Sequence, residues 1–293
     1  MPDRPGISLT FDRDVIHNKD CSRMKELPDE AIDLIISGPP YWNFIDYSAF
    51  CRGENHLWQK DSPYESYLKD LVKWHKECFR VLRRGRYCIV NLTTMSRGST
   101  TYPIPFHAVA LLEKIGFSFC FEIVWHKVSG GRGRMRNFVQ YPYPGGFTPN
   151  IRTEYLLVFR KTPEVRFVKY RNQSEKEQSR ITLNDFFVRE IANNVWHIPP
   201  PSKGAKPAHP CPFPIEIPAR LIKLFSLPGE TVLDPFAGIG TTARAAKALG
   251  RHFIGYEIEA DFIRTAMEAL KKPVQWRSQI LCRYEKHDWD PIV

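Results

Sequence analysis

Short apolar runs that alternate with helix-length amphipathic stretches constrain the fold of this chain more than any other feature. Six runs bounded by turn residues are typical of buried strands: Ile32–Ile36, Tyr87–Leu92, Phe117–Trp125, Tyr155–Phe159, Thr231–Leu233 and His252–Tyr256. Helix-period stretches lie between several of them: Tyr64–Leu82, Pro105–Ile115, Pro214–Phe225, Thr241–Leu249 and Ala260–Leu270. Strands that alternate with helices of this length predict an α/β domain with a doubly wound, mostly parallel sheet.

The alternation is interrupted in the middle of the chain, which predicts three consecutive parts. Residues 128–210 are rich in Gly, Pro and charged side chains, and apart from a core strand at 154–160 we expect an inserted recognition lobe and a linker there. The prolines near residue 200 mark the return to the core, because such a run cannot continue a helix or a central strand. Residues 1–127 and 211–293 would then form the two halves of the core.

The composition is that of a globular protein, since 43% hydrophobic residues suffice to bury a core in a chain of 293 residues. No apolar run approaches the roughly 18 residues of a membrane-spanning helix, and the N-terminus lacks the apolar stretch of a signal peptide. We therefore expect a cytoplasmic, nucleoid-associated protein with no membrane partner. The seven cysteines form no CxxC pair, which argues against a zinc ribbon and a disulfide framework, so no metal site is expected.

A net charge of +10 favours a polyanionic partner, and the charge is concentrated in one segment. The stretch from Val128 to Asn172 contains nine Lys or Arg residues and two Glu residues, so it holds +7 of the total. Basic side chains with interleaved aromatics suit phosphate contacts and base stacking. We assign DNA contact to Arg132, Arg134 and Arg136; a solvated surface loop is the alternative.

A glycine-rich turn between a strand and a helix marks a ligand site. The sequence runs from Asp234 through Gly238 and Gly240, and Glu257 ends the next strand. Glycines let the backbone approach a ligand, and an acid at that strand tip accepts hydrogen bonds from ribose hydroxyls. The spacing fits both NAD and S-adenosylmethionine, or a plain strand-to-helix turn. The Asp234 carboxylate favours S-adenosylmethionine, because it repels a pyrophosphate and attracts a sulfonium or ammonium group.

A second candidate site follows the first apolar run, in the sequence Ser37-Gly38-Pro39-Pro40-Tyr41-Trp42. The prolines lack an N–H group and fix φ, so the preceding carbonyls are rigid acceptors at the carboxyl end of a strand, where open α/β sheets bind ligands. Such acceptors suit an exocyclic amine, and the Tyr41 ring offers a face on which an extruded base stacks. We assign DNA contact to Trp42. The alternative is a proline turn whose two aromatic rings plug the core.

These motifs and their order resemble the β-class DNA amino-methyltransferases, which modify adenine N6 or cytosine N4 and often belong to restriction–modification systems. The resemblance covers the stretch HNKDCSRMKELPDEAIDLIISGPPYW, the strands FEIVWHK and TEYLLVFRK, and the run from VWHIPPP to FIRTA. It implies a Rossmann-like fold with an inserted target-recognition region, S-adenosylmethionine as the cofactor and double-stranded DNA as the substrate.

The resemblance also implies roles for individual residues. Asp20 would contact the adenine of the cofactor, Glu257 would take the ribose, and Pro214 opens the helix that corresponds to the family's first cofactor-binding helix. Phe236, Gly238 and Gly240 would surround the methionine part, and Thr241 is assigned to the same cofactor site. A cognate restriction endonuclease, and a monomeric or dimeric state, are further expectations.

One position departs from the family's pattern. The family has Asp, Asn or Ser directly before the two prolines, where this chain has Gly38, with Ser37 one position earlier. Methyl transfer makes the attacking nitrogen transiently cationic, and a glycine offers it only a carbonyl group. We expect the carbonyls of Gly38 and Pro39, with the Ser37 hydroxyl, to act as acceptors. The neutral loop favours cytosine N4 over adenine N6 as the target.

Two other functions fit part of the sequence. A catalytically weak DNA-binding module would keep the cofactor and DNA sites and lack turnover because of Gly38. An NAD-linked oxidoreductase would use the same glycine turn, although no proton-relay residue stands beside that turn in the sequence.

Overall fold

The computed structural model describes residues 11–42, 62–97, 100–128, 151–162, 172–201 and 213–274. They form an eight-stranded sheet in the order β1-β10-β9-β2-β3-β7-β6-β8 and a separate hairpin, β4-β5. The strands are β1 (Val15–Asn18), β2 (Ile32–Ser37), β3 (Leu82–Leu92), β4 (Met95–Arg97), β5 (Thr100–Tyr102), β6 (Phe117–His126), β7 (Thr153–Lys161), β8 (Val195–His197), β9 (Thr231–Asp234) and β10 (His252–Glu257). The helices are α1 (Tyr64–Val81), α2 (Ile104–Ile115), α3 (Gln173–Gln178), the π-helical turn η4 (Phe187–Ile191), α4 (Glu216–Phe225), α5 (Thr241–Ala248) and α6 (Ala260–Leu270).

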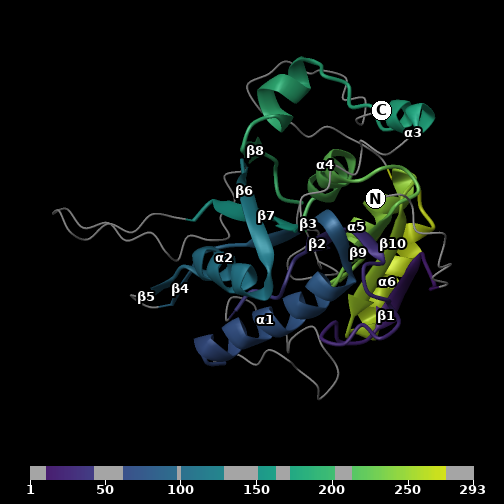
Figure 1. Ribbon diagram of the computed structural model, residues 1–293. Coiled ribbons are helices and arrows are strands. Elements are labelled where there is room, and N and C mark those ends of the chain that lie inside the picture. The colour runs from purple at the N-terminus through teal and green to yellow at the C-terminus, as the bar shows by residue number, and fades with distance from the viewer. Residues whose placement is uncertain are drawn as a thin grey trace.

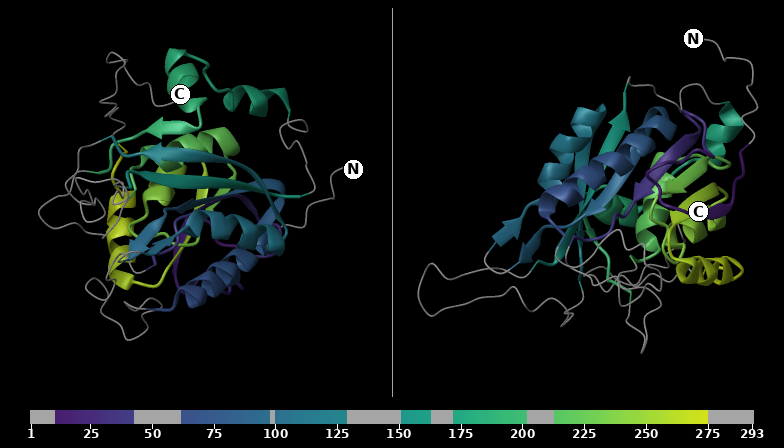
Figure 2. Two further views of the ribbon diagram at one scale, coloured as in Figure 1. Left: turned by 90° about the vertical axis from the view of Figure 1, so that its left-hand side faces the viewer. Right: turned by 90° about the horizontal axis from the view of Figure 1, so that it is seen from below.

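Helices cover both faces of the sheet, which makes three layers. The buried side chains of α1 and α2 belong to the core cluster on one face, and those of α4, α5 and α6 belong to the cluster on the other. Figure 1 shows α1 and α2 together below the sheet, and the segment 172–201 above it on the side of α4; the left view of Figure 2 shows the same arrangement. The central strand β2 is therefore buried at every position, as expected for a parallel strand covered on both sides.

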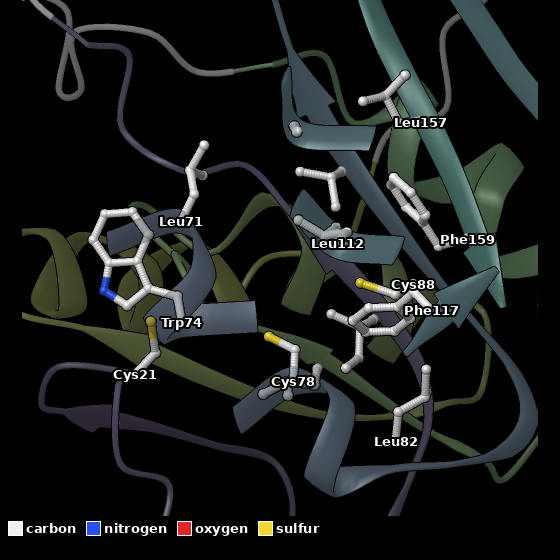
Figure 3. Close-up of a cluster of buried hydrophobic side chains, with 14 of the residues drawn as sticks. Cys21, Leu71, Trp74, Cys78, Leu82, Cys88, Leu112, Phe117, Leu157 and Phe159 are labelled. Carbon is white, nitrogen blue, oxygen red and sulfur yellow. The ribbon is translucent and has the colours of Figure 1, made fainter. Parts of the chain in front are cut away.

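The first helical layer follows directly from the spacing of apolar residues in α1. Tyr67, Leu71, Trp74, Cys78 and Val81 recur every three or four residues and are all buried. In Figure 3, Leu71, Trp74 and Cys78 point into the layer between the helix and the sheet. Each buried side chain of this size contributes roughly 1.5–3 kcal/mol relative to an exposed one, so this face is enough to fix α1 on the sheet.

Strand direction brings the candidate sites to one edge. Strands β1, β10, β9, β2 and β3 are parallel neighbours, so their carboxyl ends meet at the same edge of the sheet. Strand β7 runs antiparallel to β3, and therefore begins at that edge. The loops after β2 and β9 leave neighbouring strands, because Ile35 pairs with Leu233.

The predicted fold class is confirmed: the sheet is mostly parallel, and its helices alternate with strands on both faces. The predicted strands lengthen by one to five residues, and helix α6 has the predicted bounds. Two short strands of the main sheet, β1 and β8, were missed. Of these, β8 lies in the stretch where we expect a recognition lobe and a linker, and it pairs with β6 at the end of the main sheet. Within the described residues, no helix is both long and apolar enough to cross a membrane.

Candidate functional site

The turn between β9 and α5 has the shape that its glycines allow. The φ angle is 50° at Gly238 and 77° at Gly240, both in the left-handed region that favours glycine. A Cβ atom on Gly240 would lie 2.8 Å from the Cβ of Ala266 on α6. Gly240 is therefore required twice, for its backbone conformation and for the close approach of the turn to α6.

Asp234, at the end of β9, is buried and bonded to the turn itself. Its carboxylate accepts hydrogen bonds from the Thr242 hydroxyl at 2.6 Å and from the Phe236 backbone N–H at 3.0 Å. Burial raises the pKa of Asp234 to about 6. Its contacts therefore hold the turn in shape, and the attraction of a positively charged cofactor that we expect from the sequence stays a prediction.

Glu257 connects the end of β10 to the same turn. Its carboxylate accepts hydrogen bonds from the backbone N–H groups of Gly238, at 2.8 Å, and Glu259, at 2.9 Å. Burial raises its pKa above the ordinary value. An ionised carboxylate has about four acceptor positions, so two hydrogen bonds leave capacity for a ribose diol. The position and the acceptor chemistry of Glu257 therefore fit the ribose of a nucleoside cofactor.

Three other predicted cofactor residues lie near the same edge. Asp20 follows β1, whose Asn18 pairs with Glu257, and its carboxylate accepts from the Ser22 N–H group at 2.7 Å. Phe236 packs edge-on against Trp74 of α1, with ring centroids 4.9 Å apart. Thr241 is the first residue of α5.

Pro214 stands just before α4. Its carbonyl accepts a hydrogen bond from the Ile217 N–H group at 3.1 Å, so the proline opens the first turn of that helix. Helix α4 packs against β2, from which the proline loop leaves, and against α5, which follows the glycine turn.

The proline loop leaves β2 with Pro39 buried and Gly38 and Pro40 half-buried. Gly38 is not in the left-handed region, and a Cβ atom there would lie 3.5 Å from Cε1 of Phe213, an ordinary van der Waals distance. The backbone therefore tolerates a side chain at position 38, so steric crowding does not explain the glycine.

Ser37 does not point into the loop. Its side chain is fully buried, and its hydroxyl oxygen lies 3.2 Å from Nε2 of His75, a fully buried residue of α1. The expectation that this hydroxyl accepts a hydrogen bond from a target amine is wrong, because the side chain has no exposed surface and is directed toward the helical layer. The acceptors left to the loop are its backbone carbonyls.

The two aromatic residues of the loop have different environments. Trp42 is only 3% exposed, its indole N–H donates to the carbonyl of Ser62 at 2.9 Å, and its ring packs against Tyr64 and Tyr102. The assignment of Trp42 to DNA contact is therefore wrong, and the alternative of a core plug is correct for this ring. Tyr41 is half-buried and donates its hydroxyl to Oε2 of Glu154 at 2.7 Å.

Neither His75 nor Glu154 was assigned a role from the sequence. A signal for Glu154 does exist, because it is the only carboxylate of β7 and directly precedes the apolar run Tyr155–Phe159. Arg132, Arg134 and Arg136 lie outside the described residues. Among the residues that the structure covers, no group of three or more His, Cys, Asp and Glu side chains is arranged to hold a metal ion.

Comparison with known proteins identifies this combination of loops. The family model for DNA methylases that act on N6 and N4 matches residues 32–268. The type II methyltransferase M.MjaI of Methanocaldococcus jannaschii is 30% identical over 288 residues, covering 87% of this chain and 89% of that protein. The DNA adenine methyltransferase YhdJ of Escherichia coli is 27% identical over 284 residues, covering 93% of this chain and 87% of that protein.

A solved structure supports the cofactor assignment. The Thermus thermophilus protein TTHA0409, a DNA modification methylase solved in complex with S-adenosyl-L-methionine, superposes with a TM-score of 0.67 at 27% identity and covers 87% of this chain and 93% of that one. The family match and this complex favour S-adenosylmethionine over NAD, and a methyltransferase over a non-catalytic module. The chain belongs to the N6 and N4 DNA methylase family, and is an S-adenosylmethionine-dependent DNA amino-methyltransferase of the restriction–modification type.

Proposed function

We propose that this enzyme extrudes its target base from the DNA duplex and methylates the exocyclic amino nitrogen directly, at cytosine N4 in preference to adenine N6. One observation carries the proposal. The neutral Gly38-Pro39-Pro40 loop and the glycine turn leave adjacent strands at the same edge of the sheet, since Ile35 of β2 pairs with Leu233 of β9. A base held at the first loop and a methyl group held at the second are then neighbours, and this proximity removes most of the entropic barrier to transfer.

The residues at this edge fit the cofactor. Glu257 would hold the ribose, Asp20 the adenine, and the turn from Phe236 to Thr241 the methionine part. When bound, S-adenosylmethionine would supply an electrophilic methyl group to the amino nitrogen, with S-adenosylhomocysteine as the leaving group and one N–H proton lost to solvent. Asp234 and Gly240 keep the turn in shape through the contacts to Thr242 and Ala266 described above.

Transfer to an amino group needs no covalent enzyme intermediate, and three of the four described cysteines are poorly suited to form one. Cys21, Cys78 and Cys88 are all buried, and burial raises the pKa of each thiol well above its usual range. The loop instead offers backbone carbonyls of Gly38 and Pro39, which accept hydrogen bonds from the amino group and stabilise the positive charge that develops on it.

The preference for cytosine rests on the neutrality of this loop. No side chain at position 38 adds charge or a hydroxyl beside the target nitrogen, and the Ser37 hydroxyl is fully buried against His75. The neutral form resembles the serine loop typical of the cytosine enzymes in this family. The relative YhdJ is named a DNA adenine methyltransferase, so adenine N6 is the competing target.

Mass spectrometry of nucleosides tests the reaction and the target together. DNA from cells that express the gene is expected to contain N4-methylcytosine, which DNA from cells with the empty vector lacks. N6-methyladenine alone would contradict the preference for cytosine. Neither nucleoside, in DNA of varied composition and with cofactor binding demonstrated, would contradict the proposed reaction.

Base extrusion is tested at the loop. If the target base stacks on Tyr41, Tyr41→Ala removes roughly 1–3 kcal/mol of stacking and lowers turnover about 10- to 100-fold. Full methylation by Tyr41→Ala would contradict the stacking. Nucleoid association, a cognate endonuclease and a monomeric or dimeric state stay predictions.

A further inference from the structure

A buried carboxylate next to the proline loop is not explained by the motifs above. Glu154 is the second residue of β7, and its side chain is only 1% exposed. Because β7 runs antiparallel to β3, Glu154 lies at the sheet edge where β2, β9 and β10 end. It is therefore at the same edge as the cofactor turn, on the side of the proline loop.

We propose that Glu154 is a positioning residue that holds the Tyr41 ring in the orientation in which it receives the target base. The proposal rests on the proposed stacking role of Tyr41. It deepens that role by naming the group that fixes the ring.

Three elements converge on this carboxylate. Oε2 accepts a hydrogen bond from the Tyr41 hydroxyl at 2.7 Å and from Nδ2 of Asn91, on β3, at 2.9 Å. Oε1 accepts from the ammonium group of Lys127, which follows β6. Glu154 thus links the proline loop to the two strands that flank β7, and the loop cannot shift without breaking a charge-assisted hydrogen bond.

The ion pair with Lys127 keeps the carboxylate itself in place. Lys127 is 18% exposed, and its Nζ atom lies 4.5 Å from the centroid of the Trp125 ring. A cation over an aromatic face is held by the quadrupole of the ring, so the lysine is fixed from two sides. The negative charge of Glu154 is thereby balanced within the protein by a group that does not belong to the loop.

Hydrogen-bond chemistry sets the direction of each partner. A carboxylate that forms an ion pair only accepts, so Tyr41 must donate its hydroxyl and Asn91 must present its NH₂ group. A tyrosine side chain has only two torsions, and fixing its hydroxyl leaves the ring little freedom. Asn91 Oδ1 is turned away from Glu154 and is buried without a partner among the described residues. Such an orphaned acceptor lowers stability, so stability alone does not account for the cluster.

A double-mutant cycle of Tyr41→Phe and Glu154→Gln tests the proposal. Both substitutions nearly keep the side-chain volume: Tyr41→Phe removes the donor of the hydrogen bond, and Glu154→Gln removes the charge of its acceptor. Turnover, the KM for a DNA duplex that contains the site, and S-adenosylmethionine affinity by calorimetry are measured for each variant. Glu190→Gln is the matched control, because Glu190 is equally buried, at 1% exposed, and its contacts are to Arg220 and His197.

We expect each single variant to lower kcat about 10- to 100-fold, the range for a hydrogen bond to a charged group, with unchanged cofactor affinity. The double variant should be no slower than the slower single variant, since both changes act on the same charge-assisted hydrogen bond. With 2-aminopurine as the target base, binding of each variant should still increase the fluorescence of the DNA. The maximum intensity should differ from that reached with the parent enzyme. Glu190→Gln should leave kcat unchanged.

Multiplicative losses in the double variant, or an equal loss of kcat in Glu190→Gln, would overturn the positioning role. Should Glu154→Gln fail to fold, Tyr41→Phe alone tests the bond: full activity contradicts the proposal. The outcome is separable from the proposed function. An active Tyr41→Ala contradicts stacking itself, whereas an inactive Tyr41→Ala with fully active Tyr41→Phe and Glu154→Gln leaves stacking intact and removes only the role of Glu154.

Discussion

His75 Nε2 lies 3.2 Å from the hydroxyl oxygen of Ser37, the residue directly before Gly38, and both side chains are fully buried. Nδ1 of His75 lies 2.8 Å from the carbonyl oxygen of Leu71. A carbonyl only accepts, so Nδ1 carries the proton and Nε2 accepts from the Ser37 hydroxyl. A neutral histidine on α1 therefore anchors the strand end from which the proline loop departs. Burial lowers its pKa to about 4.

Protein stability should consequently fall in mild acid. In the unfolded chain His75 binds a proton below its ordinary pKa of 6.5, whereas in the folded protein it stays neutral until the pH approaches about 4. Acid thus favours the unfolded state, and the loss between pH 6.5 and 4 amounts to about 3 kcal/mol in full, at roughly 1.36 kcal/mol per pH unit. Urea unfolding of the parent protein and of His75→Gln, at about pH 7.5, 6 and 5, measures this loss of stability. Parallel pH curves for the two proteins would contradict the assignment.

Gly240→Ala should destabilise the protein more than a glycine substitution at the same backbone angle elsewhere. Gly229 also has a φ angle of 77°, but a Cβ atom there meets nothing within 4 Å, whereas at Gly240 it lies 2.8 Å from the Cβ of Ala266. Gly229→Ala should cost about 1–2 kcal/mol for the left-handed conformation alone. Gly240→Ala should cost about 1–3 kcal/mol more for overpacking. Urea unfolding gives the loss of unfolding free energy for each variant. Equal losses would show that the turn shifts to accommodate the added Cβ atom.

Glu257→Ala should weaken S-adenosylmethionine binding about 10- to 100-fold, because charge-assisted hydrogen bonds to a ribose diol are worth roughly 1.5–3 kcal/mol. Glu257→Gln should lose less, since one amide oxygen still accepts from the Gly238 N–H group. Glu268→Gln, on the exposed face of α6, serves as the control. Calorimetry gives the affinities, and an unchanged Kd for Glu257→Ala would remove the ribose role.

Gly38→Asp should fold normally and shift the target toward adenine. The φ angle at Gly38 lies outside the left-handed region, and a Cβ atom would be 3.5 Å from Phe213. A carboxylate there places a negative charge beside the nitrogen that becomes cationic. Gly38→Ala separates the effect of bulk from that of charge. Methylation of duplexes that carry only cytosine or only adenine targets, measured with tritiated cofactor, gives the preference. Equal ratios of cytosine to adenine methylation in the parent protein and both variants would show that position 38 does not determine the target base.

Neutralising Arg132, Arg134 and Arg136 together should weaken DNA binding at every sequence. The slope of log affinity against log salt should fall by up to about 0.9 for each phosphate that the variant no longer neutralises. Neutralisation of Arg264, Lys271 and Lys272, which are exposed on α6 and directly after it, removes the same number of charges and is the control for net charge. If the slope of the triple variant equals that of the control, the three arginines do not bind phosphates.

The local pattern alone predicts most of the elements. Helix α6 has its predicted bounds, because an amphipathic stretch of eleven residues identifies its own buried face. Strand β1 escaped prediction, since its four residues VIHN become a strand only by pairing with β10, more than two hundred residues away in sequence. Strand β8 was missed for the same reason, as its pairing with β6 is long-range.

The functional loops are also local, so the sequence by itself determined their identity: a glycine turn that begins after Asp234, an acid at Glu257 and a proline loop at Gly38. Only the tertiary structure decided where their side chains point. Ser37 bonds to His75 across the helical layer, Trp42 joins the core, and Glu154 meets Tyr41 over a separation of 113 residues. Side-chain direction at the end of a strand depends on which neighbours fill the adjoining space, and those neighbours come from distant parts of the chain.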